Sequence, residues 1–195
     1  MGSTYRINEI FYSLQGEGFF TGTASVFIRF SGCNLECPFC DTRHEEGTEM
    51  SAREIIEAIS PWPSPHVVLT GGEPSLFIDR ELVEALHGDG RFIAIETNGT
   101  NPLPEGIDWI TYSPKQFWLP EAEPAITECD ELKVVYTGQD LSRYSAIKAA
   151  HRFIQPCDTG DGDMNRKLIE ESVEFCKRNP QWRLSLQTHK FIDIK

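Results

Sequence analysis

Three cysteines within one short segment have the spacing that most directly indicates chemistry. They are Cys33, Cys37 and Cys40 in the run CNLECPFCDT, which ends at Thr42. Thiolates this close in sequence can bind one soft metal centre once the loop curls around it. Three cysteines on a four-iron cluster leave one iron free for a small molecule, whereas electron-transfer clusters usually bind a fourth cysteine. The motif therefore favours an iron centre that takes part in catalysis.

Other interpretations of the cysteines stay open at this point. The three cysteines and His44 could form a closed Cys3His zinc site. A disulfide framework is less expected, because Cys129, Cys157 and Cys176 are scattered and a chain of this length needs no cross-links. We expect those three to be buried thiols in a protein of the reducing cytoplasm.

Composition restricts the class of partner. The 195 residues are enough for a single domain, which we expect to span 1–195. The net charge is −12, from 30 acidic and 18 basic residues, and no basic run stands out. Such a surface repels phosphate backbones, so a small-molecule substrate is favoured over nucleic acid. No apolar stretch has the length of a membrane-spanning helix, so no membrane partner is expected.

The pattern of apolar residues predicts alternating strands and helices, which is typical of parallel βα units. A full eight-fold barrel needs about 250 residues, so we expect a partial, open α/β barrel of six units, the (β/α)6 type. Strands are expected at 5–14, 25–30, 66–70, 92–97, 109–112, 132–136, 153–155 and 182–186. Helices are expected after Ser51, after Asp79, and over 141–150 and 164–178, with Ser51 and Asp79 as caps.

Polar motifs follow five of the predicted strands. They are the cysteine loop, TGGEP from Thr70, ETNG from Glu96, SPK from Ser113 and QP from Gln155. Ligands of open α/β folds bind beyond the carboxyl ends of the strands, so these motifs should line one site. Arg29 lies inside a predicted strand and needs either a carboxylate neighbour or a bound anion.

With these residues in place, the chain resembles the radical S-adenosylmethionine (SAM) superfamily. The C-x3-C-x2-C loop with its aromatic Phe39 and the Gly-Gly-Glu-Pro motif starting at Gly71 carry that resemblance. Over nearly its whole length the chain is similar to the 7-carboxy-7-deazaguanine synthase family. The more selective motifs are EIFYSLQGEG (9–18), ETNGT (96–100), YSPK (112–115) and LSLQTHK (184–190).

The resemblance implies a carbon–nitrogen lyase of queuosine biosynthesis with the fold of radical SAM enzymes. It would convert 6-carboxy-5,6,7,8-tetrahydropterin to 7-carboxy-7-deazaguanine by radical ring contraction with loss of ammonia. It would use a [4Fe-4S] cluster, SAM and Mg²⁺, accept electrons from flavodoxin or ferredoxin, and form a homodimer. The alternatives are a glycyl-radical activating enzyme and a non-catalytic zinc or iron–sulfur protein.

The resemblance also implies roles for individual residues, although it singles out no catalytic side chain. The cluster would be held by Cys33, Cys37 and Cys40, and magnesium by Thr42. SAM would contact Phe39, Cys40, Asp41, Gly72, Glu73, Ser113, Pro114, Lys115, Gln155, Pro156, Cys157 and Asp158, with Glu73 receiving its ammonium. The pterin would contact Leu14, Gln15, Gly16, Arg29, Thr70, His189 and Lys195.

Overall fold

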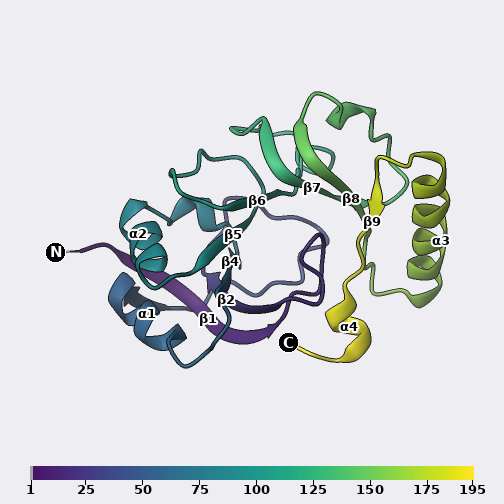
Figure 1. The fold of residues 1–195 in the computed structure, drawn as a ribbon. Coiled ribbons are helices and arrows are strands. Elements are labelled where there is room, and N and C mark those ends of the chain that lie inside the picture. The colour runs from purple at the N-terminus through teal and green to yellow at the C-terminus, as the bar shows by residue number, and fades with distance from the viewer. Residues whose placement is uncertain (1) are drawn as a thin grey trace.

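A computed structural model describes residues 2–195 and contains one curved sheet with helices on its outer side (Figure 1). The nine strands run in the order β3-β1-β2-β4-β5-β6-β7-β8-β9. They are β1 (Thr4–Leu14), β2 (Ala24–Phe30), β3 (Thr48–Ser51), β4 (His66–Gly71), β5 (Phe92–Thr97), β6 (Trp109–Tyr112), β7 (Glu128–Tyr136), β8 (Lys148–Pro156) and β9 (Arg183–Leu184). The helices are α1 (Ala52–Ile59), α2 (Arg80–Gly88), α3 (Gly162–Arg178) and α4 (Thr188–Ile192), with short turns η1 (Pro74–Leu76) and η2 (Ser142–Tyr144).

The sheet is parallel from β2 to β9 and antiparallel where β1 pairs with β2 and β3. The two edge strands, β3 and β9, do not pair with each other, so the barrel stays open. The predicted open α/β fold is therefore confirmed. The parallel strands place their carboxyl ends along one edge of the sheet, where ligands bind in this class.

Alternation along the strands separates the outer core from the inner face. On β2, the side chains of Val26, Ile28 and Phe30 are buried in the outer core with α1 and α2. Phe27 and Arg29 point the other way, toward the interior of the curved sheet. A second outer core lies over β6, β7 and β8, where it includes Trp182.

The predicted helix starts are confirmed by their caps. Ser51 and Glu54 form the expected capping box, in which the Ser51 hydroxyl accepts from the Glu54 amide and the Glu54 carboxylate accepts from the Ser51 amide. The Asp79 carboxylate accepts from the Leu82 amide at 3.0 Å and begins α2. These hydrogen bonds could be predicted from the sequence because both partners lie within one turn of helix.

The predicted helix over 141–150 is wrong. Only the short turn η2 forms there, and β8 already begins at Lys148. Strands β7 and β8 are each nine residues long and pair along most of their length, so their backbone groups are satisfied by the sheet. An isolated ten-residue helix is marginal and does not compete with that ladder. The six helical units are also incomplete, because within residues 2–195 no α-helix connects β5 to β6, β6 to β7 or β7 to β8.

The C-terminal segment, residues 185–195, crosses the open side of the sheet and returns to β1 (Figure 1). The Thr188 amide donates to the Gly16 carbonyl at 2.9 Å, and the Ser13 hydroxyl donates to the Lys195 carbonyl at 2.5 Å. The Lys195 ammonium also pairs with Glu9 of β1. Neither α4 nor the short strand β3 was predicted from the sequence. Among residues 2–195, no helix has the length and apolar character to cross a membrane.

Candidate active site

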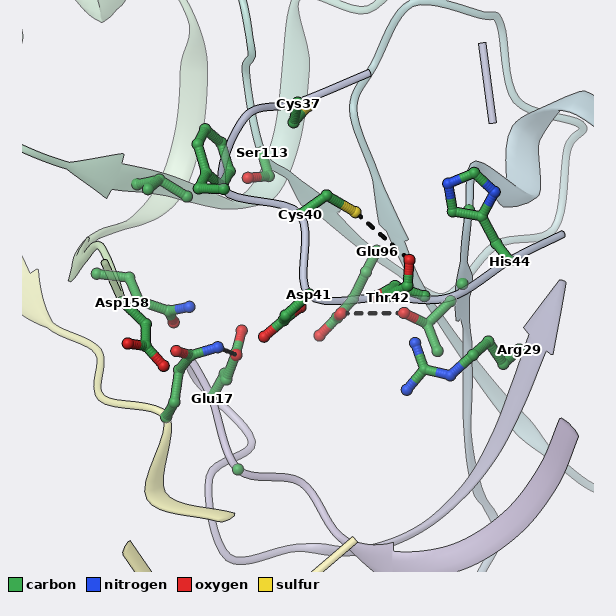
Figure 2. A pocket seen from close by; sticks show the side chains of 18 of the residues that line it. Glu17, Arg29, Cys37, Cys40, Asp41, Thr42, His44, Glu96, Ser113 and Asp158 are labelled. Carbon is green, nitrogen blue, oxygen red and sulfur yellow. Dashed lines mark hydrogen bonds between the residues drawn. The ribbon is translucent and has the colours of Figure 1, made fainter. Parts of the chain in front are cut away.

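A pocket of about 840 Å³ opens at the carboxyl ends of the parallel strands (Figure 2). It is bounded by the cysteine loop after β2, by the loops after β4, β5, β6 and β8, and by the C-terminal segment. All the residues that the sequence predicted for the site line this pocket except Pro114, whose neighbours Ser113 and Lys115 do. The strand-end motifs are therefore brought together.

Backbone hydrogen bonds tie the cysteine loop to the loop after β4. The Gly72 amide donates to the Phe30 carbonyl at 3.1 Å, and the Glu73 amide donates to the Gly32 carbonyl at 2.9 Å. A Cβ on Gly72 would lie 1.9 Å from the Gly32 carbonyl oxygen. Glycine is therefore required at 72 because two loops of this chain meet there, apart from any approach to a ligand.

Glu73 joins the ends of β4 and β5. Its side chain is buried, and its Oε1 accepts from the Thr97 hydroxyl at 2.6 Å and from the Ser75 amide at 3.0 Å. Its Oε2 accepts from the Asn98 amide at 2.7 Å. Both carboxylate oxygens thus have partners within the protein. The predicted contact of Glu73 with the SAM ammonium stays a prediction.

The three loop cysteines are free thiols, and they lie close enough to affect one another's pKa. Burial raises the pKa of Cys33 and of Cys37, and the charges of the other two cysteines raise the pKa of Cys37 further. Within residues 2–195, no three His, Cys, Asp or Glu side chains converge where a single ion could be held. A four-iron cluster would bind each of the three thiolates through a different iron.

Arg29 has the carboxylate neighbour that its place in a strand required. Its Nε lies 3.0 Å from Glu9 Oε1 across the β1–β2 pair, and its guanidinium lies 5.8 Å from the centre of the Phe11 ring. The arginine is partly exposed to the pocket, which leaves donors available to an anionic ligand. Figure 2 shows its side chain at one side of the pocket, pointing inward.

Glu17 lies across the pocket from Arg29 and Glu96 lies between them, and both carboxylates point toward the same space as Asp41 (Figure 2). Between Glu17 and Glu96 lies the ammonium of Lys133, on the inner face of β7. The side-chain amide of Gln187, in the C-terminal segment, donates to Glu17 at 3.0 Å. Of these residues, Asp41 is a predicted SAM contact, whereas Glu17, Glu96 and Gln187 stand in the quoted motifs without a predicted role and Lys133 stands in none.

Lys190, for which the sequence predicted no role, also joins separate segments of the pocket. Its Nζ lies 2.9 Å from Asp41 Oδ2, in the cysteine loop, and 2.8 Å from Asp158 Oδ2, after β8. Its hydrogen bond, together with those of the Gly160 amide and the Asn165 side chain, lowers the pKa of Asp158 to about 2. The lysine thereby links α4 to two segments predicted to bind SAM.

Lys115 is a further lysine of the pocket and lies beside the cysteine loop. Its Nζ donates to the Ser113 hydroxyl at 2.5 Å and lies 5.7 Å from the centre of the Phe39 ring. Burial lowers the pKa of Lys115, and its charge in turn works to lower the pKa of Cys37. A cation here stabilises thiolate charge, which suits the anionic ligand set of an iron–sulfur cluster.

Comparison with known proteins agrees with this geometry. Residues 27–115 match the family model described as the Radical SAM superfamily. The chain is 56% identical over 190 residues to the 7-carboxy-7-deazaguanine synthase of Bacteroides thetaiotaomicron, covering 97% of this chain and 98% of that protein. It is 44% identical over 220 residues to the synthase of Nitratidesulfovibrio vulgaris, covering 98% and 99%. The crystal structure of QueE from Escherichia coli superposes with a TM-score of 0.77 at 27% identity, covering 95% of both chains.

The open parallel sheet and the three-cysteine loop at its carboxyl edge define a radical SAM protein. Within that superfamily, the sequence identity to relatives matched over their full length indicates the particular family. The chain belongs to the 7-carboxy-7-deazaguanine synthase family. This membership decides against the two alternatives, a glycyl-radical activating enzyme and a non-catalytic metal protein.

Proposed function

We propose that this chain converts 6-carboxy-5,6,7,8-tetrahydropterin to 7-carboxy-7-deazaguanine with release of ammonia, in queuosine biosynthesis. The observation that carries the proposal is the single pocket that joins the cysteine loop to Gln15, Arg29 and Thr70. Relatives named as this synthase match the chain over nearly its whole length. The net reaction removes ammonia from the pterin and needs no other change in atoms, which suits an enzyme that rearranges a bound ring.

The residues of the pocket fit the cofactors of this family. Cys33, Cys37 and Cys40 would hold the [4Fe-4S] cluster, and the buried carboxylate of Glu73 would keep the neighbouring loops in place around SAM. When bound, the cluster and SAM supply the radical that removes hydrogen from the substrate. The protein orients the substrate beside them and excludes water.

Opposite ends of the substrate find complementary groups in the pocket. The carboxylates of Glu17 and Glu96 are hydrogen-bond acceptors, which suits the N–H donors of the amino-pyrimidinone ring. Arg29 offers donors to the substrate carboxylate, and the Thr42 hydroxyl would hold Mg²⁺, which would help to neutralise that carboxylate. A single hydroxyl is a weak hold, so magnesium binds mainly when the substrate supplies further oxygens.

The deciding experiment is anaerobic turnover of the synthetic carboxy-tetrahydropterin by protein with a fully assembled cluster. The expected result is one deazapurine and one ammonia per pterin without net consumption of SAM. The proposal is overturned if the loaded protein cleaves SAM under strong reductant but leaves the pterin unchanged.

The remaining features of the proposal concern the surroundings of the enzyme. We infer a single domain over residues 1–195, because the one sheet carries all segments of the pocket among residues 2–195. A flavodoxin or ferredoxin supplies the electron, and the enzyme works as a homodimer in the cytoplasm. Reduction assays with each carrier and sedimentation of the purified protein test these inferences.

A further inference from the structure

Lys133 is a buried cation at the centre of the proposed pterin site. Its side chain is only 7% exposed, and its Nζ lies 2.5 Å from Glu17 Oε2 and 3.4 Å from Glu96 Oε1. Glu131 lies two residues earlier on the same inner face of β7 and is also buried. An unpaired ammonium at this depth would be costly, so the carboxylates and the lysine form one unit.

Each carboxylate of this unit also receives a hydrogen bond from another segment of the pocket. Glu96 accepts from the side-chain amide of Gln15 (Nε2) at 3.1 Å and from the Thr70 hydroxyl at 3.3 Å. Glu17 accepts from the side-chain amide of Gln187 (Nε2) at 3.0 Å. Gln15 and Thr70 are two of the residues that the family resemblance assigns to the pterin. Lys133 therefore contacts Glu96, which binds both of these side chains, and Glu17, which binds Gln187 of the C-terminal segment.

The electrostatics of the unit depend on the lysine. Burial works to lower the pKa of Lys133, but attraction by Glu17, Glu96 and Glu131 outweighs it and raises that pKa. Burial likewise works to raise the pKa of Glu17, and the Lys133 charge outweighs it and lowers that pKa. Removing the lysine would leave two carboxylates facing each other without a cation, which favours their separation or protonation.

We propose that Lys133 is a positioning residue for the pterin. It holds Glu17 and Glu96 in the arrangement that aims Gln15, Thr70 and the two carboxylates at the amino-pyrimidinone edge of the substrate. This inference rests on the proposed function for the identity of the ligand. It assigns Lys133 no contact with SAM or the cluster, because its hydrogen bonds all go to the carboxylates of the pterin end within residues 2–195.

The test is Lys133→Met, which removes the charge and keeps a long unbranched side chain. We expect the KM for the pterin and its equilibrium dissociation constant to rise about tenfold or more, since one partner of a buried charge pair is lost. The KM for SAM, the iron content and the rate of SAM cleavage without pterin should stay at wild-type values. Lys148→Met is the matched control, because Lys148 is exposed at the amino-terminal end of β8 and does not line the pocket.

A second variant keeps the proposal testable if the single substitution impairs folding. Lys133→Gln removes the charge but keeps a side chain that can donate to Glu17, and we expect it to fold while still binding the pterin more weakly than wild type. Pterin affinity at the wild-type value in either folded variant overturns the proposal, and so does an equal rise in the KM for SAM. Wild-type protein that binds the pterin without converting it overturns the proposed function alone, since the binding titration still tests Lys133. Wild-type protein that binds no pterin overturns both.

Discussion

Substitution of Gly72 by alanine tests whether contact between two loops holds the cluster site together. The new Cβ would lie 1.9 Å from the Gly32 carbonyl oxygen, so the loops must separate by about 1.1 Å to reach 3.0 Å, the shortest distance found for Cβ atoms. That movement breaks or lengthens the hydrogen bonds from Gly72 to Phe30 and from Glu73 to Gly32. At about 0.5–1.5 kcal/mol for each bond, we expect Gly72→Ala to lower the free energy of unfolding by about 1–3 kcal/mol.

The assay is denaturant unfolding of the metal-free protein together with iron and sulfide content after anaerobic reconstitution. Gly162→Ala is the matched control, because a Cβ at 162 meets no atom within 4 Å and the residue begins α3. We expect the control to be neutral or stabilised by up to about 1 kcal/mol, with normal cluster loading. The reasoning is refuted if Gly72→Ala matches the control in both stability and cluster content.

Three further substitutions probe other parts of the pocket. Gly16→Ala would place its Cβ 2.2 Å from His189 Nδ1, so we expect the C-terminal segment to shift and the pterin KM to rise while cluster content stays normal. Thr42→Ala should raise the magnesium concentration needed for half-maximal turnover and spare the cluster, and an unchanged magnesium titration would remove Thr42 from the site. In Lys190→Met, the pKa of Asp158 should return from about 2 toward its ordinary value near 3.8. A lowered carboxyl pKa gives stability above pH 3.8 that is lost as the pH falls toward 2, so this variant should show less change in thermal midpoint over that window.

Features set by local sequence could be predicted. The caps at Ser51 and Asp79 need partners within three residues, and the alternation in 25–30 correctly places Arg29 on a different face from Ile28. The strand-end motifs could be assembled because parallel strands align their carboxyl ends by rule. Arg29 also shows that a charge inside a strand predicts a partner, which proved to be Glu9.

Features set by distant partners could not be predicted in the same way. Lys133 and Glu17 are 116 residues apart, and Lys190 and Asp41 are 149 apart, so no periodicity connects them. Lys133 nevertheless shares the sequence feature that drew attention to Arg29, because it is a charged residue between buried apolar residues of a strand. The wrong helix over 141–150 has the same origin, because its last three residues belong to β8, which pairs with the distant strand β7.

The two ends of the pocket are held by interactions of different kinds, and this predicts different local stability. At the cluster end, Gly72 and Glu73 donate backbone hydrogen bonds to neighbouring loops, and the Glu73 side chain is buried. At the pterin end, α4 is five residues long, none of them buried, and Phe191 is 67% exposed. Segments with few buried contacts open at low free-energy cost.

Amide hydrogen exchange of the substrate-free protein tests this difference. We expect amides in 188–192 to exchange at least about tenfold faster than those of Gly72 and Glu73, because no residue of α4 is buried. Addition of the pterin should slow exchange in 188–192 more than at Gly72, since His189, a predicted pterin contact, lines the pocket there. Equal protection of the two regions before the pterin is added would show that the C-terminal segment is as firmly held as the cluster loop, contrary to this reasoning.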